Sequence, residues 1–284
     1  MQYIEQTKNW AEFRKSAKGE DFYEIDGTFI QKMSLPFGKC WLYVNRGPII
    51  NLDKLAKREN AVFARFEHPY QKSENHKFEK NLKNAHAHYQ PETTLVIDLT
   101  KSNEEILAQM KPKGRYNIKL AQKKEVQIRE EPKADEFYEL LQETTSRDKF
   151  HGHNKDFYQK MIDMVDDAKL YIAEYQGEPI AGLIATFYKD TATYYYGASS
   201  NKHRNVMAPY LLQWHAICEA KSKGCNYYDF LGIAPEGAKN HPWQGVTAFK
   251  RKFGGEVVEY ANYKERIYQP FWYWVMRIIK KLRG

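Results

Sequence analysis

The apolar residues in the first part of the chain fall in short runs, separated by polar residues and turn formers. Runs of this length predict strands, and a serine followed three residues later by a glutamate predicts the start of a helix. Ser102-Asn-Glu-Glu105 has that pattern, and the Pro112 and Gly114 pair is expected to end its helix. The other expected elements are helices at 9–18 and 52–59 and strands at 22–25, 28–34, 40–44, 61–66 and 93–99.

In the later part of the chain, helical periodicity alternates with strand-like runs. Gly177 and the Lys189-Asp190 pair mark two tight turns, so the three strands around them should form an antiparallel meander. Apolar residues spaced by three and four between Met207 and Cys218 predict a helix, which Gly224 closes. The other expected elements are a basic helix at 115–124, helices at 134–144 and 155–165, and strands at 126–129, 170–175, 179–188, 192–198 and 227–233.

This order of elements resembles that of a Gcn5-related N-acetyltransferase domain. In that fold two neighbouring strands splay apart and the acyl donor lies in the gap, which here would be lined by residues 194–200 and 227–232. Enzymes of this type that use acetyl-CoA hold its pyrophosphate on a glycine-rich loop at a helix N-terminus. In an alignment on Arg204, Met207 replaces the first glycine and Pro209 lacks an N–H. Coenzyme A is therefore not the expected donor.

The net charge of the chain indicates which kind of partner is expected. The 284 residues include 44 Lys and Arg against 36 Asp and Glu, a net charge of +8. This favours a polyanionic partner such as nucleic acid, a phosphorylated substrate or an anionic membrane face, although a generally basic surface would have the same composition. The three cysteines form no CxxC pair and predict neither a disulfide framework nor a zinc site, so we expect a reducing compartment and no metal.

The two ends of the chain bear on location. The first residues contain no apolar signal segment, and no apolar run is long enough to span a membrane, so a cytoplasmic protein is expected. Residues 268–284 are aromatic at the start and basic at the end, which is typical of an interfacial helix. A terminal helix docked on its own core would show the same pattern. Peripheral contact with the inner face of the membrane is thus one of two open interpretations.

Several short motifs resemble the FemABX family of peptidoglycan-bridge aminoacyltransferases. The best defined are Tyr228-Asp-Phe-Leu-Gly232 and Phe249-Lys-Arg-Lys-Phe-Gly-Gly255; the others lie at 37–48, 94–99, 115–121, 196–200 and 209–214. The resemblance implies an α/β (α+β) fold of two acetyltransferase-like (GNAT-type) domains, with mixed, mostly antiparallel sheets flanked by helices. We expect these domains at 1–114, joined by 261–284, and at 115–260. No heptad run interrupts the second, so no coiled-coil arm is expected.

The resemblance also implies a reaction. Members of the family take an amino acid from aminoacyl-tRNA and add it to the stem-peptide amine of a peptidoglycan precursor, either UDP-linked or lipid-linked. A tRNA ester is already activated, so positioning and oxyanion stabilisation suffice, and aminoacyl-tRNA is the only co-substrate expected. We expect a monomer. The alternatives are a related acyltransferase that uses another donor and a non-catalytic relative that binds RNA or membrane.

Candidate site residues follow from the same resemblance. The family has a functional Lys after a Phe, which matches Lys250 and Phe249 and implies contact with tRNA phosphate, a terminal base or the oxyanion; a solvated Lys and a core Phe are the alternatives. An Arg and a first-domain Lys are expected to grip the precursor's diphosphate. Arg204 and Lys32 fit these roles, with Lys39 as a second choice for the Lys.

The remaining candidates come from their positions on predicted elements. Asp98 ends an apolar strand, where it could accept the amine proton or simply cap a turn. Tyr196 and Tyr228 face the gap between the splayed strands if alternation is regular, or otherwise pack in the core. The basic helix at 115–124 could contact the tRNA backbone or present a solvated face. Its candidate tRNA ligands are Lys119, Lys123 and Lys124.

Overall fold

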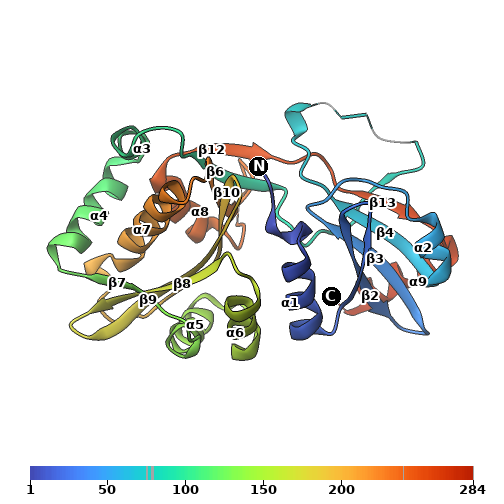
Figure 1. Ribbon diagram of the computed structural model, residues 1–284, viewed down its shortest axis with the longest axis horizontal. Coiled ribbons are helices and arrows are strands. Elements are labelled where there is room, and N and C mark those ends of the chain that lie inside the picture. Colours follow the sequence, from blue (N-terminus) through green and yellow to red (C-terminus); the bar gives the residue numbers. More distant parts are fainter. Residues whose placement is uncertain (75, 78–79, 239, 284) are drawn as a thin grey trace. The chain divides into compact units, whose positions relative to one another are not determined.

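The computed structural model describes residues 1–74, 76–77, 80–238 and 240–283, with the backbone alone at 280–283. The chain forms two compact units (Figure 1). The large unit comprises Met1–Ile4 and Thr93–Val258, and the small unit comprises Glu5–Glu92 and Glu259–Gly284. Among the described residues, no helix combines the length and the apolar character needed to cross a membrane.

The small unit is built on a six-stranded sheet in the order β1-β2-β3-β4-β13-β5. The pairing is antiparallel except between β3 and β4, which run parallel. Its elements are the 3₁₀ helix Ile4–Gln6, α1 (Lys8–Lys18), β1 (Asp21–Ile25), β2 (Thr28–Leu35), β3 (Lys39–Asn45), α2 (Asp53–Arg58), β4 (Ala61–Glu67), the 3₁₀ helix Lys72–Glu74, β5 (Lys83–Asn84), β13 (Lys264–Ile267) and α9 (Pro270–Arg283).

Side-chain alternation gives the central strand β3 two buried faces. Leu42 and Val44 pack in one cluster with residues of α2, whereas Trp41 and Tyr43 pack in another with Tyr273 of α9. A strand that is covered on both faces has apolar residues at consecutive positions, and the sequence of β3 has such a run. The helix α9 is therefore part of the small unit's core through its inner face.

The large unit has a seven-stranded sheet in the order β12-β6-β11-β10-β9-β8-β7. Helices α4 and α7 cover one face and α5 and α6 the other (Figure 1). Its elements are β6 (Thr93–Asp98), α3 (Asn103–Gln109), α4 (Pro112–Lys123), β7 (Gln127–Glu130), α5 (Asp135–Asp148), α6 (Lys155–Met164), β8 (Ala168–Tyr175), β9 (Glu178–Tyr188), β10 (Thr191–Ser199), the 3₁₀ helix Arg204–Val206, α7 (Ala208–Ser222), β11 (Tyr227–Gly232), α8 (Gln244–Lys250), the 3₁₀ helix Arg251–Phe253 and β12 (Glu256–Glu259).

The predicted fold class is confirmed: both units carry mixed, mainly antiparallel sheets flanked by helices. The capping box of α3 is also confirmed, since the Ser102 hydroxyl accepts from the Glu105 N–H and the Glu105 carboxylate accepts from the Ser102 N–H. Pro112, however, begins α4 rather than only ending α3, because proline is compatible with the first turn of a helix.

The boundary between the units differs from the expected division at residue 114. The chain passes from the small to the large unit after Glu92, because β6 pairs antiparallel with β11 and completes the large unit's sheet. The helices α3 and α4 follow β6 into that unit. The return of the C-terminal segment to the small unit starts at Glu259, two residues before the expected start.

Candidate active site

Strands β10 and β11 diverge in the middle of the large sheet. They run parallel and pair at only three positions, Thr191–Thr193 against Tyr227–Asp229. Beyond these positions β10 stays paired with β9 as far as Ser199, while β11 stays with β6 through Gly232 and Thr94. An opening between the carboxyl ends of two parallel strands is a common place for a ligand in a mixed α/β sheet. The splay expected from the sequence is therefore present.

A local distortion shapes the end of β11 at this opening. The register against β6 shifts between Asp229 and Gly232, and Leu231 has a φ of 61°, which non-glycine residues rarely adopt. The Asp229 carboxylate, which is fully buried, accepts the Leu231 N–H at 2.7 Å. The Thr94 hydroxyl lies within hydrogen-bond distance of Asp229 Oδ1 and of Leu231 O. Such strained backbone is held by its surroundings and is frequent at functional sites.

Lys250, the last residue of α8, lies at this opening. Its side chain is only 6% exposed, and its ammonium donates to the Gly232 carbonyl at 2.7 Å. The Nζ atom also lies 5.5 Å from the centre of the Tyr194 ring. Burial lowers the pKa of Lys250 to about 8, although the Asp229 carboxylate opposes this shift. Lys250 can thus donate a proton near neutral pH. We call Lys250, Asp229, Leu231, Gly232 and Tyr194 the splay site.

Tyr194 and Gly197 form the β10 side of this site. Burial raises the pKa of Tyr194 to about 12, and Gln213 of α7 is its hydrogen-bonding neighbour. The Tyr194 hydroxyl fills the space that a Cβ on Gly197 would need, so only glycine fits there. Gly197 is therefore required by its packing against a tyrosine of its own strand.

The tyrosines predicted to face the opening do not do so. A β-bulge between Tyr194 and Tyr196 inserts one extra residue and turns Tyr196 to the opposite face, where its ring lies 5.0 Å from that of Tyr158 on α6. Tyr228 is fully buried and donates its hydroxyl to Gln213 at 2.7 Å. Neither side chain lines the opening: the bulge turns Tyr196 away from it, and Tyr228 pairs with Ala192, before the two strands diverge.

Phe249 lies beside Lys250 but belongs to the core of the large unit. Its ring packs edge-on against Tyr210 at 5.1 Å and against Phe253 at 5.4 Å. It remains half-buried. The structure therefore gives Phe249 the packing role that was its alternative interpretation.

Asp98 lies at the far end of β6 from the splay site. It pairs with Tyr227, which is five residues before Gly232, or about 16 Å along a strand. Its carboxylate accepts the Thr100 hydroxyl at 2.6 Å and the Thr100 N–H at 3.0 Å, and these bonds lower its pKa. This geometry is that of a turn-capping Asp rather than of a proton acceptor in the splay site.

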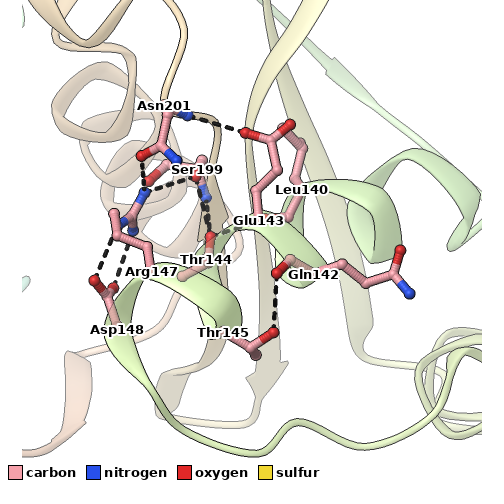
Figure 2. A network of polar contacts seen from close by, with 9 residues as sticks. All are labelled: Leu140, Gln142, Glu143, Thr144, Thr145, Arg147, Asp148, Ser199 and Asn201. Carbon is pink, nitrogen blue, oxygen red and sulfur yellow. Dashed lines mark hydrogen bonds and ion pairs between the residues drawn. The ribbon is translucent and has the colours of Figure 1, made fainter.

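The loop that follows β10 is held by α5. Figure 2 shows the contacts: Arg147 donates to Ser199 O and to Asn201 Oδ1, both at 3.1 Å, and Glu143 accepts the Asn201 N–H at 3.0 Å. The bonds from Asn201 and Ser200 lower the pKa of Glu143, so it accepts as a carboxylate. The loop is thereby fixed in position ahead of α7.

Arg204 follows this loop in an exposed 3₁₀ turn. The start of α7 offers few groups to a phosphate, since Pro209 has no N–H and the Tyr210 N–H donates to Met207 O. Met207 itself has a φ of 59° and provides no side-chain cap. These details agree with the absence of a pyrophosphate loop that the sequence indicated.

The remaining predicted ligands lie on two surfaces. Lys119, Lys123 and Lys124 are all exposed on α4 of the large unit. Lys32 belongs to the small unit, where its ammonium is 2.8 Å from the Glu59 carboxylate. Bonds from Lys32 and Arg58 lower the pKa of Glu59 to about 2, so Lys32 is part of a neutralised pair.

A cavity of about 570 Å³ is lined by residues of α8 and of the segments that precede and follow it. Three cations line it: Lys111 at the start of α4, and Arg251 and Lys252 just after Lys250. The Lys111 N–H donates to Lys252 O at 3.1 Å, which joins the two segments. The cavity therefore leads from the turn after Lys250 towards the basic helix α4.

Sequence reasoning missed the buried polar residues in and next to the splay site. Asp229 and Thr94 are fully buried, and Gln213 is 2% exposed. The signal was present for Asp229, a carboxylate in the apolar run Tyr228-Asp-Phe-Leu, since a buried charge needs partners. No comparable signal exists for Thr94 or Gln213, because threonine is common in strands and glutamine on helices.

Comparisons with known proteins bear on the family of the chain. A model of the FemAB family matches residues 71–178 and 164–281. Aminoacyltransferase FemA of Staphylococcus epidermidis is 31% identical over 121 residues, which is 42% of this chain and 29% of the relative. Aminoacyltransferase FemB of the same organism is 29% identical over 91 residues, 32% of this chain and 22% of the relative. The matched part thus spans under a third of these relatives.

Solved structures show the same fold over nearly the whole chain. The crystal structure of FemX superposes with a TM-score of 0.85 at 18% identity, covering 96% of this chain and 94% of that one. L-PGS from Bacillus licheniformis superposes with a TM-score of 0.60 at 12% identity, covering 96% and 91%. At these identities the likeness concerns the fold alone.

Proposed function

The chain belongs to the FemAB family, and from that premise we propose that it is an aminoacyltransferase. In this proposal it moves an amino acid from aminoacyl-tRNA to the stem-peptide amine of a peptidoglycan precursor, UDP-linked or lipid-linked. The relatives named aminoacyltransferase support the reaction class. The observation that carries the proposal is the buried Lys250 at the splay site, with its pKa lowered to about 8.

The proposed chemistry is an exchange of an ester for an amide. The neutral amine of the precursor attacks the ester carbonyl of the aminoacyl-tRNA, and a tetrahedral oxyanion forms. The carbon–oxygen bond to the tRNA then breaks, the attacking nitrogen gives up one of its protons to become the amide N–H, and the 3′ oxygen leaves with a proton. A protonated Lys250 stabilises the oxyanion, and its lowered pKa eases proton transfer to the leaving oxygen. The amine itself loses its proton before the attack.

The proposed tRNA path follows the cations next to α8. The cavity lined by Lys111, Arg251 and Lys252 would receive backbone phosphates near the acceptor end. The exposed lysines of α4 continue this positive surface. Arg204 of the large unit is a proposed ligand of the precursor's diphosphate. Lys32 of the small unit is a second proposed phosphate ligand, with the condition that it would have to exchange Glu59 for phosphate.

Replacement of Lys119, Lys123 and Lys124 by alanine is expected to weaken tRNA binding. Removal of each lysine that neutralises a phosphate should lower the slope of log K against log salt by roughly 0.7–0.9, and affinity should fall several-fold at physiological salt. Filter binding over a salt series measures both quantities. A matched triple variant in the small unit, at Lys8, Lys15 and Lys18 of α1, should leave the slope unchanged. An unaltered slope in the α4 variant would exclude these lysines as phosphate ligands.

The decisive assay of the proposed function follows a labelled amino acid. Label should appear in UDP-linked or lipid-linked muropeptide only when the amino acid is presented on tRNA. Consumption of an acyl-CoA instead would favour a related acyltransferase that uses another donor. Binding of tRNA or precursor without any turnover would indicate a non-catalytic relative.

A further inference from the structure

The outer face of α9 exposes more apolar surface than the fold requires. Phe271 is 67% exposed, Trp274 60% and Ile278 38%, at spacings of three and four residues that place them on one side of the helix. We call these three residues the outer stripe. Docking of the helix depends on the opposite side, where Tyr273 is 9% exposed, packs on Phe63 and donates its hydroxyl to Glu265. The outer stripe thus has no part in holding the small unit together.

A second segment adds an aromatic residue beside this stripe. Phe37, at the tip of the β2–β3 hairpin, is 71% exposed, and its ring lies 5.6 Å from that of Trp272. Phe37 and Gly38 have φ values of 62° and 64°, and the Lys39 N–H donates to Pro36 O, so the hairpin has a type I′ turn. The first central position of that turn favours Asn, Asp or Gly. A phenylalanine there costs folding stability and exposes its ring to solvent.

The charged residues of α9 are all basic. Helix α9 contains no acidic residue, and its sequence includes Arg277 and three later cations at 280, 281 and 283. The side chains at 280–283 lie outside the described part of the chain, but their charge follows from the sequence. The Lys39 ammonium lies 5.2 Å from the centre of the Trp272 ring. Aromatic residues flanked by cations are the composition of helices that lie in an anionic lipid interface.

We propose that the outer stripe and Phe37 form a docking surface for an anionic lipid bilayer. The aromatic rings would enter the headgroup region, and the Lys39 and Arg277 side chains would attract the lipid phosphates. Each Lys or Arg near such a surface strengthens binding, and the contribution is lost when salt screens it. This proposal stands on the small unit alone and does not depend on the aminoacyltransferase activity.

The test is sedimentation of the whole protein with vesicles of phosphatidylcholine containing about 30% phosphatidylglycerol, a composition that carries the surface charge required. The wild type should partition onto these vesicles at least about tenfold more strongly than onto pure phosphatidylcholine. About 0.5 M NaCl should remove most of this difference. Trp274→Glu should reduce partitioning at least about tenfold. Tyr116→Glu removes an equally exposed aromatic from α4 of the large unit and should bind like the wild type.

Phe37→Asn separates a role in binding from a role in folding. Asparagine suits the type I′ turn, so the melting temperature should stay level or rise, while vesicle binding falls several-fold. Equal binding by wild type and Trp274→Glu, or equal losses in the Trp274 and Tyr116 variants, would overturn the proposal. Light scattering could also overturn it. If the wild type is a dimer and only Trp274→Glu dissociates it, the surface binds a second copy of the chain rather than a bilayer.

Discussion

Replacement of Lys250 by methionine is expected to reduce aminoacyl transfer by roughly 10²–10³-fold, the range found when one donor to an oxyanion is removed. Methionine has a similar length and suits the buried position, so the loss should concern the ammonium rather than the packing. Single-turnover transfer from charged tRNA at saturating precursor measures the chemical step. A decrease in the rate of that step with unchanged tRNA affinity is the expected pattern.

Lys223→Met is the matched control for this variant. Lys223 lies at the end of α7 and is paired with Glu219 on the surface, far along the helix from the splay site. Its replacement should leave transfer within about twofold of the wild type, since surface substitutions have small effects. A Lys250→Met enzyme as active as this control would remove Lys250 from the mechanism, and a loss of the same size in both variants would point to a general defect.

The lowered pKa of Lys250 also predicts a pH effect on stability. The folded-state pKa is about 8 and the ordinary value is 10.5, so between these values the unfolded chain binds more protons than the folded one. The cost of burying the ammonium is fully present below pH 8 and is lost as the pH rises to 10.5. Relative to that of Lys250→Met, the free energy of unfolding of the wild type should rise by on the order of 3 kcal/mol over that range. Urea unfolding of both proteins at several pH values measures the difference.

Gly114→Ala is expected to destabilise the large unit by about 2 kcal/mol or more, since a rigid overlap in a packed interior must displace backbone. A Cβ on Gly114 would lie inside the contact distance of the Lys252 carbonyl oxygen, which accepts the Lys111 N–H. Both partners are main-chain atoms, so no flexible side chain can move aside. The shift would separate α4 from the 3₁₀ turn Arg251–Phe253, and transfer activity should fall with stability because that turn follows Lys250 directly.

Gly245→Ala is the same substitution in a helix with free space. No atom lies within 4 Å of a Cβ at this position of α8, and its backbone is helical. Alanine should therefore stabilise by roughly 0.5–1 kcal/mol, the difference in helix propensity. Thermal unfolding of the two variants should give melting temperatures on opposite sides of the wild type. Equal shifts would contradict the argument that the Lys252 carbonyl excludes a side chain at residue 114.

Local patterns predicted most of the elements, because periodicity, capping and turn formation depend on residues that are close together in the sequence. The helix at 8–18, the capping box at Ser102 and the antiparallel meander after α6 all lie where periodicity and turn residues indicated. The family resemblance, carried by short motifs in a fixed order, is confirmed by the match at 71–281.

Long-range pairing could not be predicted in the same way. Strand β6 joins β11 across some 130 residues of sequence, and a local apolar run does not encode its partner; this is why the expected boundary lay at residue 114 rather than at Glu92. The orientation of Tyr196 failed for a related reason. A single inserted residue in β10 reverses every side chain that follows, and a bulge has no signature in this run of tyrosines.

The sequence by itself determined the fold class, the family and the reaction class that we propose, because helical and strand periodicity and short motifs are properties of neighbouring residues. Only the tertiary structure decided the state of the candidate residues. It buried Lys250 against Gly232, and this burial lowers its pKa although the nearby Asp229 carboxylate opposes the shift, whereas Lys252 two residues later is half-buried and donates to the Tyr210 hydroxyl. The physical reason is that desolvation and charge proximity depend on what the fold packs around a group, and residues distant in sequence supply that packing.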